Sequence, residues 1–196
     1  MRIPIQSRLH KKVAARTVLV FLTAYFVSLL VWLPIKGGYG YVTTAIASKL
    51  AAGLTDAKVE EISTAKDVVQ VTFTPLRKRS DMLVDIPVPT SSYTFNMPLT
   101  AGIMAALYPF IARKARAYSE ALTMLFGVHL LFVFSLEAKE LTEVFIRQGL
   151  VVSSIPRIAA YQFLWGFVDN MMIRFEPFLI GFYVFIRFGR KKEAAD

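Results

Sequence analysis

The sequence predicts a mainly α-helical membrane protein, with four transmembrane helices and a small extracytoplasmic α+β module between the first and second of them. Of its 196 residues 55% are hydrophobic and only 19% are charged, which is too apolar for an ordinary soluble domain. The apolar residues form long blocks, and Lys and Arg cluster at the ends of these blocks. The absence of cysteine excludes disulfides, thiolate metal sites and cysteine nucleophiles.

The first transmembrane helix is predicted at residues 17–35, after a basic N-terminal segment at 1–16. Residues 17–33 carry no charge, and Pro34 marks the end of the block. A cleaved signal peptide is the alternative, because Ala45 and Ala47 form a small-x-small motif. That motif lies about a dozen residues beyond an apolar stretch already longer than a signal peptide requires, so we expect an uncleaved anchor.

Three more transmembrane helices are predicted at residues 96–112, 117–136 and 165–188. The first of these is short, because its apolar run reaches only about 24 Å against a hydrocarbon layer about 30 Å thick. Asn96 is expected to cap it, Pro98 to lie in its first turn and Pro109 to kink its last turn.

The distribution of Lys and Arg predicts the orientation. Three segments at the ends of the apolar blocks hold 12 of the 23 Lys and Arg residues: 1–16, 113–118 and 187–196. By the positive-inside rule, the N-terminus, the loop 113–116 and the C-terminal segment 189–196 are cytoplasmic, whereas 36–95 and 137–164 lie outside. The net charge of +9 therefore reflects topology and contact with the lipid bilayer, and requires no nucleic acid.

The module at 36–95 is predicted to begin with a flexible exit from the bilayer, formed by Gly37, Gly38 and Gly40. Residues 41–54 then predict an amphipathic helix, because apolar residues recur at intervals of four: Val42, Ile46, Leu50 and Leu54. This helix is expected either to lie at the membrane interface or to cover a sheet.

From Asp67 onward the pattern has period two and predicts a small antiparallel sheet. The expected strands are 69–74, 82–88 and 93–95, and Pro87 and Pro89 restrict the second to an edge. The basic segment 77–81 is interpreted as a solvated hairpin tip; binding of an acidic polymer or headgroup is the less favoured alternative.

The outside segment 137–164 carries three acids near its start: Glu137, Glu140 and Glu143. We expect a short interfacial helix with these acids on a solvated face. Three carboxylates at helical spacing are also compatible with a divalent cation, but no second ligand cluster accompanies them, so no metal site is predicted.

No catalytic motif of a soluble enzyme is present, and the polar residues inside the predicted spans are the informative ones. His129, Arg174 and Glu176 fall at comparable depth, so His129 is expected to face Glu176 or Arg174 across a helix interface. Arg174 and Glu176 are about 200° apart on a helix and cannot both face one partner. The cluster forms either a path for protons or substrate or a set of polar packing contacts between helices, and the packing role is favoured. Asp169 is interpreted as a residue at the membrane–water interface.

Short motifs give the chain a resemblance to the exosortase H-associated membrane proteins. They are Trp32-Leu33-Pro34, Tyr93-Thr94-Phe95-Asn96-Met97-Pro98-Leu99 and Ala160-Tyr161-Gln162-Phe163. The resemblance implies a bacterial inner-membrane accessory protein without a cofactor, working beside an exosortase-type transpeptidase. Partner-binding residues suggested by these motifs and by the fourth span are Tyr93, Phe95, Asn96, Pro98, Tyr161, Gln162 and Asp169.

Two functions are therefore expected. The first is a non-catalytic scaffold or accessory subunit of an envelope protein-sorting system, which binds a membrane transpeptidase or its client. The alternative is a small transporter or proton-coupled subunit that uses His129, Arg174 and Glu176.

Overall fold

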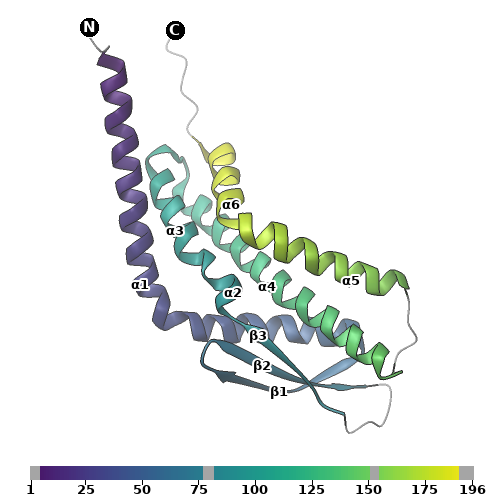
Figure 1. The fold of residues 1–196 in the computed structure, drawn as a ribbon. Coiled ribbons are helices and arrows are strands. Elements are labelled where there is room, and N and C mark those ends of the chain that lie inside the picture. Colours follow the sequence, from purple (N-terminus) through teal and green to yellow (C-terminus); the bar gives the residue numbers. More distant parts are fainter. Residues whose placement is uncertain (1–4, 77–81, 151–154, 190–196) are drawn as a thin grey trace. The chain divides into compact units, whose positions relative to one another are not determined.

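A computed structural model describes residues 5–76, 82–150 and 155–189, with side chains from residue 11 (Figure 1). The helices are α1 (Ile5–Thr55), α2 (Ser91–Thr94), α3 (Asn96–Leu107), the 3₁₀ turn η1 (Tyr108–Phe110), α4 (Lys114–Arg147), α5 (Ile155–Phe167), the π-helical η2 (Val168–Met172) and α6 (Ile173–Phe188). The strands are β1 (Ala57–Ala65), β2 (Val68–Pro75) and β3 (Val84–Pro89). The protein is thus mainly helical with one small antiparallel sheet.

The chain divides into two compact units. Unit 1 comprises Met1–Pro34, Asn96–Leu125 and Pro177–Asp196, and unit 2 comprises Ile35–Phe95 and Phe126–Glu176. Within the described residues, two helical segments are long and apolar enough to cross a membrane, judged by length and composition alone: Lys11–Thr55 and Lys114–Arg147.

Unit 1 is mainly helical in its described part, and small residues bring its helices close together. A Cβ added at Gly102 would lie 3.1 Å from the Phe21 ring of α1. A Cβ at Gly181 of α6 would lie 2.6 Å from Ile103 Cγ2 of α3. The core of the unit joins α3, α4 and α6: Met104, Ile111, Ala117, Ala121, Leu125, Ile180, Val184 and Phe188.

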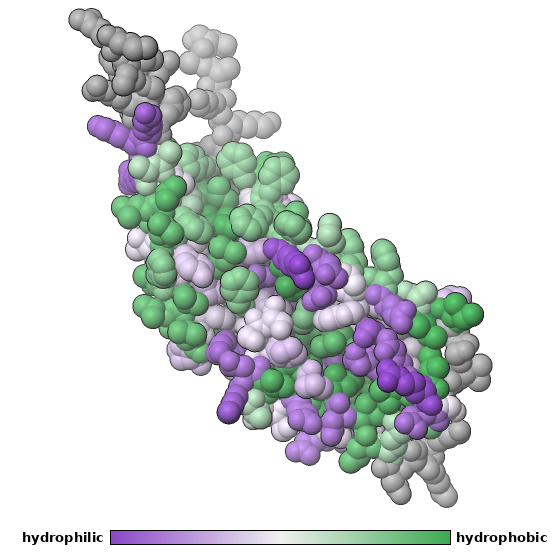
Figure 2. Space-filling model, in the orientation of Figure 1, coloured by the Kyte–Doolittle hydropathy of each residue, from purple (hydrophilic) through white to green (hydrophobic). Residues whose placement is uncertain are grey.

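The outer surface of unit 1 is rich in large apolar side chains. Exposed examples are Val18, Leu19, Leu22, Phe26, Val27, Leu30, Val31, Leu122, Phe178, Leu179, Phe182, Phe185 and Ile186. In Figure 2, hydrophilic side chains lie next to the grey N-terminal segment and give way to a largely green surface. Bulky apolar groups therefore face outward as well as inward, which is unusual for a soluble helical bundle.

Unit 2 contains the sheet, in the order β1-β2-β3 with antiparallel pairing. Val69, Val71 and Phe73 of β2 are fully buried, whereas the intervening Gln70 is exposed. The buried face packs against Ala52 of α1 and against α4, through Leu141 and Phe145. The period-two pattern thus correctly predicts which face of the sheet is covered.

The sheet differs from the predicted one in two places. The expected strand at 93–95 is wrong, because Ser91–Thr94 form the short helix α2. Strand β1 was not predicted: Lys58, Glu60 and Glu61 hide its pattern, and its register shifts between Val59 and Glu61. The strands at 69–74 and 82–88 are confirmed in substance as β2 and β3, with β3 at an edge as its prolines require. The basic segment 77–81 lies outside the described residues.

The first helix does not end at Pro34. α1 continues through this proline and the following glycines to Thr55, so the predicted flexible exit is wrong. Gly40 serves close packing instead, since a Cβ there would lie 2.4 Å from Thr90 Cγ2. A single proline costs one helical hydrogen bond, and here helix continues on both sides of it.

The amphipathic segment 41–54 is helical, as predicted, but its bulky apolar row faces outward. Val42, Ile46, Leu50 and Leu54 are 41–55% exposed. The opposite face is buried and consists of small residues: Thr43, Thr44, Ala47, Ser48, Ala51, Ala52 and Thr55. The small face covers the sheet, and the apolar row remains available at the surface.

Three predicted helix boundaries are also corrected. α4 runs on to Arg147, so no separate interfacial helix begins at Glu137. α3 ends at Leu107, and Pro109 lies in the 3₁₀ turn η1 that follows it. The last helical region already begins at Ile155 with α5 and reaches α6 through η2, whereas its predicted end at Phe188 is confirmed.

Candidate functional site

The most unusual feature of the structure is a buried polar core in unit 2 that contains two carboxyl groups. Glu137 is 0% exposed and Glu176 is 2% exposed. They come from α4 and α6, and both reach polar side chains on other helices. Buried carboxyl groups are costly unless they are paired or hydrogen-bonded, so the partners of each group define its chemistry.

Glu176 pairs with the fully buried His129 of α4, at 3.2 Å between Glu176 Oε2 and His129 Nε2. The other ring nitrogen, Nδ1, lies 2.7 Å from the Tyr39 hydroxyl of α1. If the tyrosine donates to Nδ1, the imidazole proton sits on Nε2, which lies within ion-pair distance of the Glu176 carboxyl group but forms no hydrogen bond among the described residues. The pairing of His129 with Glu176 predicted from depth is therefore present, and Tyr39 extends it to a third helix.

Aromatic rings enclose this pair. Tyr39 and Tyr93 lie edge-on to His129, with ring centroids at 5.6 and 5.2 Å, and Phe132 lies 5.3 Å from Tyr93. Burial raises the pKa of Tyr93 to about 12, so this phenol stays protonated at any physiological pH. Apolar enclosure strengthens the interaction between His129 and Glu176 and excludes water from it.

Glu137 has a different environment. Its Oε1 lies 2.7 Å from Ser48 Oγ of α1, and Ser48 Oγ also lies 2.7 Å from the Thr44 carbonyl oxygen. One hydroxyl proton serves only one acceptor, so both contacts are satisfied when a protonated Glu137 donates to Ser48 and Ser48 donates to Thr44. Glu137 Oε2 has no hydrogen-bond partner among the described residues, and no cation there pairs with it.

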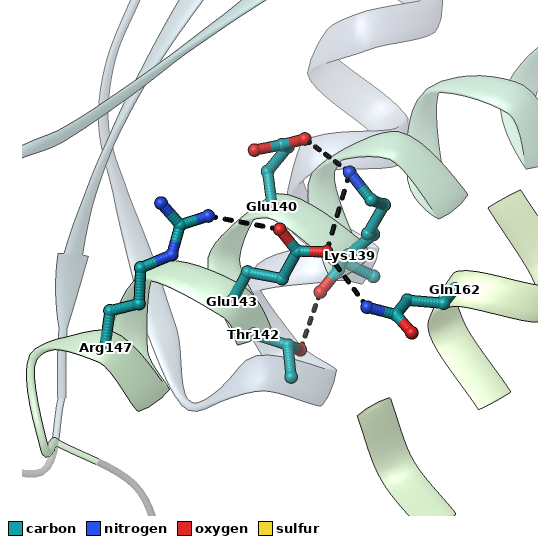
Figure 3. A network of polar contacts seen from close by, with 7 residues as sticks. Lys139, Glu140, Thr142, Glu143, Arg147 and Gln162 are labelled. Carbon is teal, nitrogen blue, oxygen red and sulfur yellow. Dashed lines mark hydrogen bonds and ion pairs between the residues drawn. The ribbon is translucent and has the colours of Figure 1, made fainter. Parts of the chain in front are cut away.

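A second polar network lies at the surface of unit 2 and ties α5 to α4 (Figure 3). Glu143 Oε1 accepts from Gln162 Nε2 of α5 at 3.4 Å, and its Oε2 lies 3.2 Å from Arg147 Nη2. Lys139 Nζ lies 2.8 Å from Glu140 Oε1 and 3.6 Å from Glu143 Oε1. The acids Glu140 and Glu143 therefore already have cationic partners.

This network corrects the prediction for the three acids. Glu140 and Glu143 are partly exposed, but Glu137 is buried and points elsewhere, so the three do not share a solvated face. Nor do they form a cation site: within the described segments, no group of three or more His, Cys, Asp or Glu side chains is placed to hold a metal ion.

The remaining predicted site residues are dispersed. Arg174 is exposed and does not join His129, in keeping with the 200° separation. Of the proposed partner-binding residues, Tyr93, Asn96 and Pro98 are buried within the chain. Phe95 and Gln162 are exposed, and Tyr161 and Asp169 are half-buried. Tyr39 and Ser48 of α1, which contact His129 and Glu137 of α4, were not predicted from the sequence. A signal was present, because the eight-residue spacing places His129 and Glu137 on one face of α4.

The comparisons with known proteins add no relative: no family model, no curated protein and no solved structure matches the chain.

Proposed function

We propose that the protein is a non-catalytic integral membrane protein that acts by binding, as an accessory or scaffold subunit of an exosortase-type protein-sorting system. The observation that carries the membrane part of the proposal is the outward-facing apolar surface of unit 1. Contiguous apolar patches of this kind on a monomer indicate contact with lipid or with another protein. The exosortase part rests on the sequence resemblance.

In this proposal α1 and α4 cross the bilayer and the shorter α3 and α6 pack beside them as the second and fourth spans. At about 1.5 Å per residue, the 12 residues of α3 and the 16 of α6 reach about 18 and 24 Å. Both need flanking turns or local thinning to span about 30 Å. By the positive-inside rule, the proposal puts the basic start of α4, the basic end of α6 and both termini on the cytoplasmic side.

The partner would be a membrane transpeptidase with the cysteine that this chain lacks. Its helix would contact α6, whose exposed face carries Phe178, Phe182 and Phe185. Large rigid aromatic side chains bury much area at low entropic cost, which favours them as anchors of a helix interface.

A client segment would instead add to the sheet, and β1 is the edge that accepts it. The opposite edge, β3, contains Pro87 and Pro89, which have no N–H to donate to an added strand. β1 offers nine residues of edge, interrupted by its irregularity between Val59 and Glu61. Strand addition would use main-chain hydrogen bonds and would thus tolerate varied client sequences.

The test is a mild-detergent pull-down of the tagged full chain from its native membrane, with copurifying proteins identified by mass spectrometry. The Phe182→Ala variant of α6 is compared with Phe26→Ala of α1, a phenylalanine on another helix that is also more than half exposed. We expect a cysteine-containing membrane transpeptidase at near-equal amounts, reduced several-fold by Phe182→Ala and unchanged by Phe26→Ala. Recovery of the chain alone, or as a homo-oligomer, would contradict the accessory function.

The buried chain of Tyr39, His129 and Glu176 favours a second candidate, a proton-coupled subunit. A carboxyl and an imidazole in contact inside a membrane protein are typical of proton relays. Reconstitution of the purified protein into vesicles with an internal pH dye tests it. This candidate requires proton flux that His129→Gln abolishes; vesicles that stay tight with the unaltered chain exclude it.

A further inference from the structure

An arginine-lined cavity lies in unit 1, where α4 begins and α6 ends. Its volume is about 260 Å³, and it is lined by Ala112, Arg113, Arg116, Arg187, Phe188 and Gly189. Three of these residues are arginines, and they come from two segments far apart in the sequence. Neither the buried polar core nor the docking surfaces proposed above use this cavity.

Backbone contacts hold the two sides of the cavity together. The Ala112 N–H donates to the Phe188 carbonyl oxygen at 2.7 Å. Next to it, Ile111 and Gly189 form an isolated antiparallel bridge. Main-chain contacts therefore join the two segments that carry Arg113 and Arg187, and both arginines line the cavity.

The cavity has a surplus of positive charge. Glu120 neutralises part of it: its Oε1 accepts from Arg116 Nε at 3.0 Å, and its Oε2 lies 3.1 Å from Arg187 Nη1. Each guanidinium has five N–H donors, so Arg116 and Arg187 keep most of theirs. Arg113 is exposed and makes no ion pair with the described residues. The lining thus carries three cations, and one carboxylate, Glu120, pairs with two of them.

The first turn of α4 adds to the attraction for anions. The Arg113 carbonyl oxygen accepts from the Ala117 N–H at 3.1 Å, which places Arg113 at the start of this long helix. The first N–H groups of a helix have no acceptor within it and carry the positive end of the helix dipole. Phosphate groups bind readily in such positions, and guanidinium groups donate to two phosphate oxygens at once.

We propose that this cavity binds the phosphate of an anionic phospholipid from the cytoplasmic leaflet. The inference rests on the membrane placement proposed above, which puts the arginines at headgroup depth. Basic pockets between helices on the cytoplasmic side suit such headgroups, and Phe188 supplies an apolar wall toward the glycerol and acyl chains.

The experiment is native mass spectrometry of the purified full chain in detergent, titrated with phosphatidylglycerol or with phosphatidylcholine. The key variant is Arg113→Asn, because Arg113 has φ +45°, a backbone conformation that asparagine tolerates. The matched control is Arg147→Asn in unit 2, an exposed arginine whose own partner, Glu143, lies four residues away. A second variant, Arg187→Gln, removes the positive charge that α6 contributes to the cavity lining.

Phosphatidylglycerol should bind more tightly than phosphatidylcholine. Arg113→Asn and Arg187→Gln should each weaken it by roughly fivefold, the effect expected for one cation near a lipid headgroup, and Arg147→Asn should leave it unchanged. Equal binding of both lipids, or equal loss in the control, would overturn the proposal. Displacement of the lipid by millimolar glycerol 3-phosphate would also overturn it, by assigning the cavity to soluble phosphate compounds.

The membrane placement has its own readout. Extraction of the protein from native membranes by alkaline carbonate would refute the placement, whatever the lipid titration gives. Retention in the membrane together with no preference for phosphatidylglycerol would refute the cavity proposal alone.

Discussion

Ser48 Oγ lies 2.7 Å from Glu137 Oε1, although 89 residues separate the two in the chain. The contact joins α1 to α4 beneath the sheet and is the hydrogen bond that the described structure gives to a fully buried carboxyl group. Because Ser48 also bonds the Thr44 carbonyl, the geometry favours a proton on Glu137. Ser48 is therefore a structural partner of Glu137, an acid that the sequence alone places on a solvent-exposed surface.

We predict that Ser48→Ala destabilises the protein by about 1–3 kcal/mol, because it leaves a buried acid without its hydrogen-bond partner. Glu137→Gln should cost less than Ser48→Ala, since an amide replaces a neutral carboxyl with nearly the same shape. Thermal unfolding in detergent measures both. The control is Thr123→Ala, which removes an exposed hydroxyl bonded to a carbonyl four residues earlier and should change little.

For the pair of His129 and Glu176, removal of one member should cost more than removal of both. His129→Leu removes the imidazole from a buried carboxyl group, at about 3–5 kcal/mol, whereas the double variant with Glu176→Leu should recover part of that loss. A double-mutant cycle of unfolding free energies gives the coupling. Arg174→Leu, on the exposed side of the same helix, is the control. Additive effects would contradict a direct interaction.

Two glycines of α1 should respond in opposite ways to the same substitution. Gly38→Ala meets no atom within 4 Å and should stabilise the helix by about 0.5–1 kcal/mol. Gly40→Ala places a Cβ against Thr90 Cγ2 and should destabilise by about 1–3 kcal/mol. Adding Thr90→Ser removes that methyl and keeps the hydroxyl that bonds the Asp67 carbonyl. If Thr90→Ser brings no recovery of the melting temperature, the close approach is not the cause.

The exposed apolar row of α1 should lie against lipid rather than water. Because the chain has no cysteine, single-cysteine variants give unambiguous labels. A nitroxide at Leu50 should be accessible to oxygen and protected from a water-soluble nickel reagent in vesicles, and one at Gln70 on the polar face of β2 should show the reverse. Protection of Leu50 from both reagents would instead indicate a protein surface over the row.

Some of this architecture follows directly from sequence patterns. Alternation in β2 identifies its buried face, since a strand exposes successive side chains to opposite sides. The comparable depth of His129 and Glu176 in the predicted spans predicts their pairing, because ionisable groups in a membrane helix are expected to avoid lipid. These predictions depend on the local periodicity of apolar residues and on the length of apolar segments, both of which can be read directly from a sequence.

The errors have a common physical origin, which is tertiary packing. Glu137 reads as a surface acid because charged neighbours surround it in sequence, yet α1 covers it with Ser48. The periodicity of the row containing Val42 and Leu50 left open whether the helix lies at the membrane interface or covers the sheet; in the structure the small residues on the opposite face approach the sheet. Neither the burial of Glu137 nor the exposure of the apolar row can be predicted from one helix alone, because each depends on the shape of the surface that packs against that helix.

The asymmetry of the sheet limits how copies of this protein can polymerise. A sheet with two free edges can grow without end, since every added copy offers a new edge. Here Pro87 and Pro89 prevent strand addition at the β3 edge. Two copies could pair through their β1 edges, but neither copy would then offer a further edge, so assembly would stop at a dimer. Crowded copies are thus protected from fibre formation by two residues that contribute nothing to the hydrogen-bond ladder.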